Sequence, residues 1–362
     1  MMAPGLEEPL DDKFLRTLQT VAPGTLLREG LDHIVRARTG ALIVVGDGPE
    51  VLSLVDGGFR VDTELMPSYL YELAKMDGAI ILTQDSKRIL HANVQLVPDT
   101  SIPSKETGIR HRTAERVALQ TGQLVIAISQ RRSVITLYQG SFKYVLRDIG
   151  FILTKANQAI QTLSRYRAVL DQALSQLSAL EFDDLVTLSD AVGVLHRAGM
   201  VLSIEGEIQR YIGELGTEGR LVSIQLDELM EKVEDQVVLV VRDYAQPGAD
   251  RSESEVRREL VQYAAEDLSN YLDLARILGF TGSLAVLDRP LVPRGYRLLR
   301  RIPRLPVQVV DNLVARFGNL QRILRSSLDE LDQVEGIGEA RARAVQEGLR
   351  RLREQVMLER RA

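Results

Sequence analysis

The chain has 362 residues, of which 45% are hydrophobic and 26% charged, and this composition predicts two or three folded domains. It contains no cysteine, so disulfides, cysteine-ligated zinc and thiol nucleophiles are excluded. The four histidines are scattered, and the sequence has no Walker A motif, no Gly-x-Gly-x-x-Gly motif and no Gly-x-Ser-x-Gly elbow. These absences argue against a histidine-rich metal site, a P-loop enzyme and a serine hydrolase.

Charge is distributed unevenly along the chain. The formal net charge is −5, but the segment 291–362 holds fifteen arginines and no lysine against nine acids, so it carries +6 and the remainder −11. A basic tail on an acidic body favours nucleic acid binding at one end only. The first twelve residues, Met1 to Asp12, are acidic and contain proline, and no run approaches eighteen apolar residues. We therefore expect a cytoplasmic protein with no membrane partner.

The part of the chain up to about Gly150 alternates between strand-like and helical patterns. The pattern predicts strands at 41–45, 80–82, 124–129 and 134–138, with the last two forming a hairpin or consecutive strands, and helices at 67–76 and 113–120. This order predicts an α/β domain built around a mainly β sheet.

Two short segments of this domain suggest nucleotide chemistry. Met76 to Ala79 precedes the strand at 80–82, and Glu106 to Arg116 follows about thirty residues later. The second segment gathers cations and hydroxyl groups behind Gly108, which suits a polyphosphate because guanidinium groups match phosphate oxygens and glycine admits close backbone approach. Asp77 supplies a carboxylate where Mg²⁺ or Mn²⁺ is expected, since these hard cations prefer oxygen ligands.

Each segment also has a simpler interpretation. Asp77-Gly78 is a common turn dipeptide between a helix and a strand. Arg110 to Arg112 could be a solvated helix face, with Thr113 capping a helix that has Glu115 and Arg116 in its first turn. The two segments together are more specific than either alone.

The pattern of apolar residues in 151–288 predicts an all-helical spacer. Apolar residues recur at helical spacing from about Lys155, and further helical windows lie at 204–215, 226–241 and 256–278, with breaks at 213–219 and 246–250. No chemistry is identified here, and a bundle or elongated connector that only sets distance explains the pattern equally well.

The remaining residues, 289–362, contain a turn in which Gly336 and Gly338 bracket an apolar residue just before a helix. This turn resembles the helix-hairpin-helix DNA-binding motif, in which backbone N–H groups at a helix start contact phosphate and read no sequence. A degenerate copy spans 302–317, with 305–307 in place of the glycine turn. The predicted DNA-binding residues are Gly336, Gly338, Arg341, Arg343, Arg300, Arg301 and Arg304. An ordinary helix-helix connector is the alternative.

The order of these parts resembles the DNA integrity scanning proteins of bacteria, a family of diadenylate cyclases, over essentially the whole chain. The resemblance implies three domains: a nucleotide-binding cyclase domain at 1–150, a helical linker at 151–288 and a helix-hairpin-helix DNA-binding domain at 289–362. It implies condensation of two ATP into cyclic di-AMP and two pyrophosphates across facing domains, with a homo-octameric assembly. It also implies association with the nucleoid and a role in a DNA damage checkpoint.

The resemblance assigns roles at matching positions. Asp77, Arg110, His111 and Arg112 are implied as catalytic, with Asp77 holding Mg²⁺ or Mn²⁺. The implied ATP-binding residues are Gly78, Ala79, Leu96, Thr107, Gly108, Ile109, Thr113, Ser129, Arg131 and Arg132. The family usually has threonine where this chain has Ile109, so one hydroxyl beside the phosphates is missing.

Two alternatives compete with the cyclase hypothesis. One is a DNA-binding scaffold or sensor that binds nucleotide without turnover, which the arginine-rich tail and Ile109 favour. The other is a different nucleotidyltransferase or a nuclease, against which the lack of a second acid at metal-pair spacing argues. If the chain is a cyclase, we expect branched or recombination-intermediate DNA, bound independently of sequence, to lower its output through coupling between the two ends.

Overall fold

The computed structural model describes residues 17–249, 251–264 and 271–359. The expectations for Met1 to Asp12 lie outside this range. The chain forms two compact units, one made of the residues up to 157 together with 209–223, the other of 158–208 and the residues from 224 onward. Among the described helices, none combines the length and apolar character needed to cross a membrane.

The first unit is built on a mixed sheet. Its described strands lie in the order β2-β5-β4-β1-β6-β7-β8, with β3 also pairing with β5, and only β1 and β4 run parallel. The strands are β1 (Ala41–Val45), β2 (Val55–Asp56), β3 (Phe59–Glu64), β4 (Ala79–Leu82), β5 (Arg88–Leu96), β6 (Leu124–Ser129), β7 (Val134–Gln139) and β8 (Phe142–Val145). The predicted strands are all present, and β6 and β7 form the expected hairpin.

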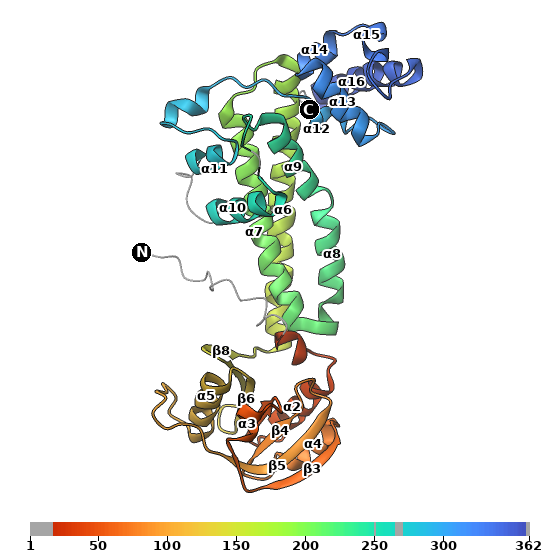
Figure 1. Ribbon diagram of the computed structural model, residues 1–362. Coiled ribbons are helices and arrows are strands. Elements are labelled where there is room, and N and C mark those ends of the chain that lie inside the picture. Colours follow the sequence, from red (N-terminus) through yellow and green to blue (C-terminus); the bar gives the residue numbers. More distant parts are fainter. Residues whose placement is uncertain (1–16, 250, 265–270, 360–362) are drawn as a thin grey trace. The chain divides into compact units, whose positions relative to one another are not determined.

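Helices cover both faces of this sheet (Figure 1). The helices of the unit are α2 (Leu26–Arg36), α3 (Pro49–Leu52), α4 (Pro67–Leu73) and α5 (Ile109–Thr121). Alternate residues of each strand enter two separate cores: Ile43 and Ile80 pack with residues of α2 and α4, whereas Val44 and Ile81 pack with residues of α5. Because both faces are buried, the central strands β1 and β4 are apolar at every position. The α/β prediction is therefore confirmed.

The helical character predicted for the middle of the chain is also confirmed. Its helices are α6 (Ile149–Asp183), α7 (Leu188–Leu215), η1 (Gly216–Gly219), α8 (Arg220–Met230), α9 (Val233–Tyr244), α10 (Glu253–Ala264), α11 (Tyr271–Ile277) and η3 (Leu284–Asp288). The window predicted at 226–241 is two helices, because Lys232 takes a left-handed backbone conformation with φ 64°. Part of the window at 256–278 lies outside the described residues.

The C-terminal helices share one core with the end of α6. They are α12 (Tyr296–Leu299), α13 (Val307–Phe317), α14 (Leu320–Arg325), α15 (Leu328–Asp332) and α16 (Glu339–Glu359). Leu299 and Leu313 from the first hairpin and Ile337 and Val345 from the second belong to the same buried cluster. Within the second unit this cluster packs the two hairpins against each other, and Figure 1 shows their helices α12, α13, α15 and α16 gathered together.

Candidate functional site

One end of the sheet collects the residues that the sequence singled out. The parallel pair Ile43↔Ile80 places the starts of β1 and β4 at the same end. The antiparallel pairs Ala41↔Ile128 and Ala79↔Val94 bring the ends of β6 and β5 to that end too. Asp77 and Gly78, which precede β4, therefore share an edge with Leu96 and Ser129, which close β5 and β6.

Asp77 and Arg110 connect the two predicted segments directly. Nη2 of Arg110 donates to Oδ1 of Asp77 over 3.3 Å, although the residues are 33 positions apart. The Asp77 side chain is otherwise fully exposed, whereas that of Arg110 is 33% exposed. The fold thus brings a solvent-facing carboxylate from one predicted segment beside a partly buried guanidinium from the other.

Gly40 leaves the space that Arg110 occupies in this position. The sequence analysis did not identify Gly40 as a site residue. A Cβ atom built on Gly40 would lie 2.9 Å from Cζ of Arg110 and 3.2 Å from the Ile128 carbonyl oxygen. The guanidinium therefore occupies the space that a side chain at position 40 would fill. A lone glycine before a strand is too common to be recognised as a site residue.

Gly78 is fixed by its contact with β5. Its N–H donates to Oδ1 of Asn93 over 3.2 Å, and a Cβ atom at Gly78 would lie 2.5 Å from Cα of Asn93. Ala79 and Leu96 are 2% and 8% exposed and belong to a buried core. Any contact they make with a nucleotide comes through backbone groups.

Helix α5 begins earlier than predicted. Gly108 is its N-cap, without a capping side-chain hydrogen bond, so Arg110, His111 and Arg112 lie in the first turn. The idea that Thr113 caps this helix is wrong, because Thr113 lies inside it. Backbone N–H groups at a helix start attract anions, and here they adjoin two guanidinium groups.

The side chains around this helix start are mostly open to solvent. Arg112 is exposed, and its Nε donates to the Glu106 carbonyl oxygen over 3.4 Å. Thr107 and Gly108 are also exposed. Ile109 is 85% exposed and has no part in the core. The residue that departs from the family pattern therefore faces solvent.

His111 belongs to a hydrogen-bonded row that the sequence analysis did not assign. Its Nδ1 lies 3.0 Å from the Tyr138 hydroxyl, which donates to Oε1 of Glu106 over 2.9 Å. Lys143 on β8 forms an ion pair with the same carboxylate oxygen. The order along the row is therefore Lys143, Glu106, Tyr138 and His111.

Burial and charge set the protonation of this row. Burial lowers the pKa of His111, and the positive charges of Lys143, Arg132 and Arg110 add to this effect against the opposing charge of Glu106. Partial burial alone would raise the pKa of Glu106, but hydrogen bonds from Lys143 and Tyr138 outweigh it and hold the pKa below its usual value. His111 is therefore neutral and Glu106 ionised near neutral pH.

The turn after β6 carries the other predicted phosphate contacts. Ser129 is half-buried, and its Oγ accepts the Arg132 N–H over 3.3 Å. Arg131 and Arg132 are exposed. The charge of Arg132 contributes to lowering the pKa of His111, so this turn lies near the start of α5.

The side chains that the structure describes fit an ion such as Mg²⁺, which takes few protein ligands, and do not form a site made wholly of protein ligands. In residues 17–249, 251–264 and 271–359 no three histidine or acidic side chains come together as metal ligands. Mg²⁺ commonly takes one or two carboxylates and completes its shell with substrate phosphates and water. The exposed carboxylate of Asp77 fits that role.

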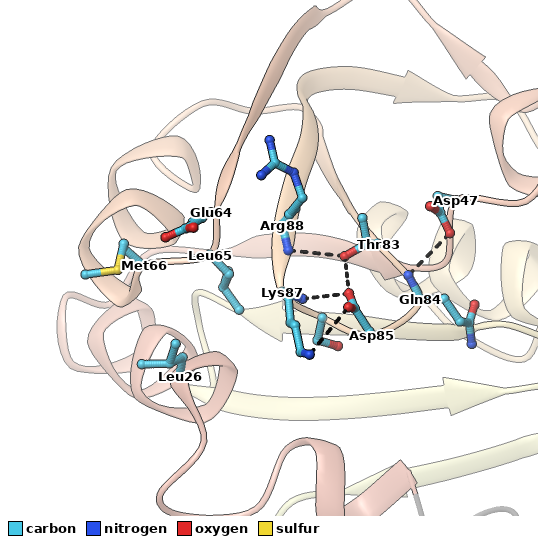
Figure 2. Close-up of a pocket in the computed structure, with 11 residues that line it drawn as sticks. Leu26, Asp47, Glu64, Leu65, Met66, Thr83, Gln84, Asp85, Lys87 and Arg88 are labelled. Atoms are coloured by element: carbon cyan, nitrogen blue, oxygen red, sulfur yellow. Dashed lines mark hydrogen bonds and ion pairs between the residues drawn. The ribbon is translucent and has the colours of Figure 1, made fainter.

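A cavity of about 670 Å³ lies at the opposite end of the sheet. Figure 2 shows the turn between β4 and β5, where Asp85 accepts hydrogen bonds from Thr83 and from the Lys87 backbone, beside Leu26 and Met66. The described lining residues of this cavity include none of the predicted nucleotide contacts. This cavity and the predicted nucleotide contacts therefore lie at different ends of the domain.

The predicted DNA-binding turn lies between α15 and α16. Gly336 has φ 82°, a conformation that favours glycine, and both Gly336 and Gly338 are exposed. Nη1 of Arg341 donates to the Gly336 carbonyl oxygen over 2.6 Å, and Arg343 forms an ion pair with Glu339. Arg341 thus braces the turn itself.

The other predicted arginines surround the connection from α12 to α13. Arg300, Arg301 and Arg304 are exposed, although partial burial lowers the pKa of Arg301. Nδ2 of Asn312 in α13 donates to the Glu335 carbonyl oxygen over 2.9 Å, which ties this hairpin to the glycine turn. Both groups of predicted DNA contacts therefore belong to one packed pair of hairpins.

Comparison with known proteins identifies the family of the chain. The family profile "DisA bacterial checkpoint controller nucleotide-binding" matches residues 28–142, and "DisA bacterial checkpoint controller linker region" matches residues 146–287. A protein from Carboxydothermus hydrogenoformans, named DNA integrity scanning protein DisA, is 59% identical and covers 95% of this chain and 98% of its own length. A protein of the same name from Symbiobacterium thermophilum is 61% identical, with 96% and 98% covered.

A solved structure of DacA from Staphylococcus aureus is 20% identical, covers 38% of this chain and 91% of its own, and has a TM-score of 0.30.

Proposed function

Because the chain belongs to the family of bacterial DNA integrity scanning proteins and is a diadenylate cyclase, we propose that it joins two ATP molecules into cyclic di-AMP and releases two pyrophosphates. The observation that carries the proposal is the contact between Asp77 and Arg110. The contact joins a carboxylate and a guanidinium at one end of the sheet, and this supports a role for Asp77 in holding a metal ion and for Arg110 in binding phosphate.

Each side chain at this edge has a proposed task. Asp77 holds Mg²⁺ or Mn²⁺, and such an ion would favour loss of the proton from the attacking 3′-hydroxyl. Arg110 and Arg112 neutralise the triphosphate, together with the free N–H groups at the start of α5. Ser129, Arg131 and Arg132 contact the phosphates from the turn after β6, and Thr107 and Thr113 add hydroxyl groups.

The backbone near β4 and β5 receives the rest of the nucleotide. Gly78 and Ala79 leave room for it, and the backbone of Leu96 reads the edge of adenine. Gly108 and Ile109 border the triphosphate at the helix start. Ile109 lacks the hydroxyl of the threonine that is usual in the family. If that hydroxyl bonds phosphate in the family, ATP binding is weaker in this chain.

The reaction is symmetric, so two cyclase domains face each other with one ATP each. Each 3′-hydroxyl attacks the α-phosphate of the opposite nucleotide, and an isolated domain is inactive. Such pairs form a homo-octamer, as the family resemblance implies.

The chain divides by function into a cyclase domain at 1–150, a helical linker at 151–288 and a DNA-binding domain at 289–362. The last domain binds branched or damaged DNA through its phosphates, with Gly336 and Gly338 at the helix start and the surrounding arginines supplying charge. Bound DNA regulates the cyclase, and the protein acts in the cytoplasm at the nucleoid.

Product analysis tests the cyclase assignment. Purified protein is incubated with ATP and Mg²⁺ or Mn²⁺, and the nucleotides are resolved by chromatography and mass. We expect cyclic di-AMP from the native chain and from Asp47→Asn, whose exposed carboxylate lies at the other end of the sheet, but not from Asp77→Asn or after addition of EDTA. ATP binding without product in the native chain would instead favour a DNA-binding sensor, and a different product another nucleotidyltransferase.

A further inference from the structure

The row from Lys143 to His111 fixes where each proton lies. A carboxylate held ionised by Lys143 can only accept hydrogen bonds, so the single proton of the Tyr138 hydroxyl is used in its bond to Glu106. The Tyr138 oxygen must then accept from Nδ1 of His111, which lies 3.0 Å away. The proton of a neutral His111 is thereby assigned to Nδ1.

The opposite edge of the His111 ring lies near Gly108, the N-cap of α5. A Cβ atom built on Gly108 would lie 3.7 Å from Cδ2 of His111, so this edge of the ring is turned toward the N-cap of α5. Nε2 is bonded to Cδ2 and lies on the same edge. A neutral ring with its proton on Nδ1 therefore presents the lone pair of Nε2 to the space at the helix start.

We infer that Glu106 and Tyr138 are positioning residues that hold His111 as a neutral proton acceptor, with its proton on Nδ1 and a free Nε2 turned toward the nucleotide. The inference rests on the proposed cyclase function. It separates His111 from Arg110 and Arg112, which remain cations throughout. Cross-strand pairing of Tyr138 with Lys143 supports this arrangement, because it builds the anchor of Glu106 into the hairpin of β7 and β8.

The acceptor takes the proton that the reaction releases. The O3′–H bond breaks and its proton passes to Nε2, while the electron pair of that bond forms the new bond from O3′ to the α-phosphorus. The bond from the α-phosphorus to the bridging oxygen of pyrophosphate breaks, and its electron pair leaves with pyrophosphate. Nδ1 keeps its proton, and the resulting imidazolium is stabilised through Tyr138 by Glu106.

Nitrogen NMR tests the tautomer directly. The four histidines are labelled with ¹⁵N in the full-length protein, solid-state spectra are recorded without nucleotide, and the His111 signals are assigned by their absence from His111→Asn. We expect a protonated Nδ1 and an unprotonated Nε2 in the native protein, and a mixture of tautomers in Tyr138→Phe. A native His111 with its proton on Nε2 would overturn the inference, whether or not the protein makes cyclic di-AMP.

Kinetics test the consequence for catalysis. In Tyr138→Phe we expect kcat to fall about tenfold or more with KM for ATP changed less than about twofold, since a positioning contact is lost and the phosphate contacts remain. In His111→Asn, which keeps a donor toward Tyr138 but lacks Nε2, we expect kcat to fall about a hundredfold.

Tyr144→Phe is the matched control. It removes another tyrosine hydroxyl within the same unit, one that donates to a different glutamate, Glu214. An equal loss of kcat in Tyr144→Phe and Tyr138→Phe would show a general effect of hydroxyl removal and would overturn the positioning role.

Discussion

Gly78 and Gly40 stand at the same edge of the sheet, yet they tolerate a side chain differently. At Gly78 the added Cβ would meet the Asn93 backbone, which cannot move without disturbing β5. We therefore expect Gly78→Ala to lower the free energy of unfolding by about 1–3 kcal/mol, as overpacked sites do. Denaturant unfolding measures this loss. Gly206→Ala in α7, which meets open space, is the control that should leave stability unchanged or slightly raised.

At Gly40 the added Cβ would clash with the end of a flexible side chain, and the nearest backbone atom, the Ile128 carbonyl oxygen, would lie 3.2 Å away. The Arg110 guanidinium can swing away, so we expect Gly40→Ala to change stability by less than about 1 kcal/mol while displacing Arg110 from Asp77. Cyclic di-AMP synthesis should fall about tenfold or more, because a misplaced cation no longer meets the phosphate. Full activity in a stable Gly40→Ala protein would show that the Asp77–Arg110 contact is dispensable.

The difference between these glycines shows what the sequence could reveal at this scale. Asp77 and Arg110 were predictable because their chemistry is concentrated in two short segments. Gly40 and Tyr138 contact residues of α5 that lie 70 and 27 positions away along the chain. The sequence around each of these residues gives no indication of such long-range contacts.

A buried ion pair joins α6 to α12 in the second unit. Nη1 of Arg297 donates to Oε1 of Glu181 over 2.6 Å, and their side chains are 3% and 1% exposed. We expect Glu181→Gln to cost about 3–5 kcal/mol, because it leaves a buried guanidinium without its counter-charge. The exposed pair of Arg350 and Glu354 offers the comparison, and Glu354→Gln should cost less than about 1 kcal/mol in the same unfolding experiment.

The two glycines of the C-terminal turn separate stability from DNA binding. Gly336 has positive φ, and a Cβ there would lie 3.2 Å from Cγ2 of Val309, so Gly336→Ala should destabilise the hairpins. A Cβ atom built on Gly338 would have no neighbouring atom within 4 Å, so Gly338→Ala should fold normally. If the turn admits DNA closely, Gly338→Ala will nevertheless weaken binding to a branched duplex by about tenfold, measured by fluorescence anisotropy. Native affinity in Gly338→Ala would mean that DNA does not approach this turn.

Strands that are apolar throughout were predicted well from the sequence. Strands that mix apolar and polar residues were missed. The apolar strands β1 and β6 lie in the middle of the sheet and read as strands at every position. β3 has a mostly exposed or half-buried pattern, and β5 alternates with polar residues, so neither stood out from the loops around them. The start of α5 was misplaced because its first turn carries charged rather than apolar residues.

At the scale of the whole molecule, the compact unit that contains the proposed cyclase domain also includes residues 209–223. Thr217 Oγ1 donates to the Pro23 carbonyl oxygen over 3.2 Å, and the Tyr144 hydroxyl donates to Glu214. Gly216 packs so closely on Pro23 that a Cβ would lie 2.6 Å from the Pro23 carbonyl oxygen. A chain cut near Gly150 loses all of these contacts, so we expect it to unfold at a lower temperature than the full chain in a thermal melt.

This architecture decides how coupling between DNA and the cyclase should be tested. Because truncation removes part of the cyclase unit itself, a change in its output would mix lost regulation with lost stability. The full chain carrying Gly338→Ala is the cleaner comparison, since it keeps every contact of the first unit. We expect branched DNA to lower cyclic di-AMP synthesis by the native chain several-fold, and to lower it much less in Gly338→Ala at the same DNA concentration.

Added salt should relieve the inhibition together with binding, because phosphate contacts release counterions when they form. Binding and inhibition measured on the same samples should therefore fall in parallel as salt rises, after correction for the effect of salt on the cyclase without DNA. Tight DNA binding with unchanged synthesis at every salt concentration would show that the basic tail and the nucleotide site work independently in this chain.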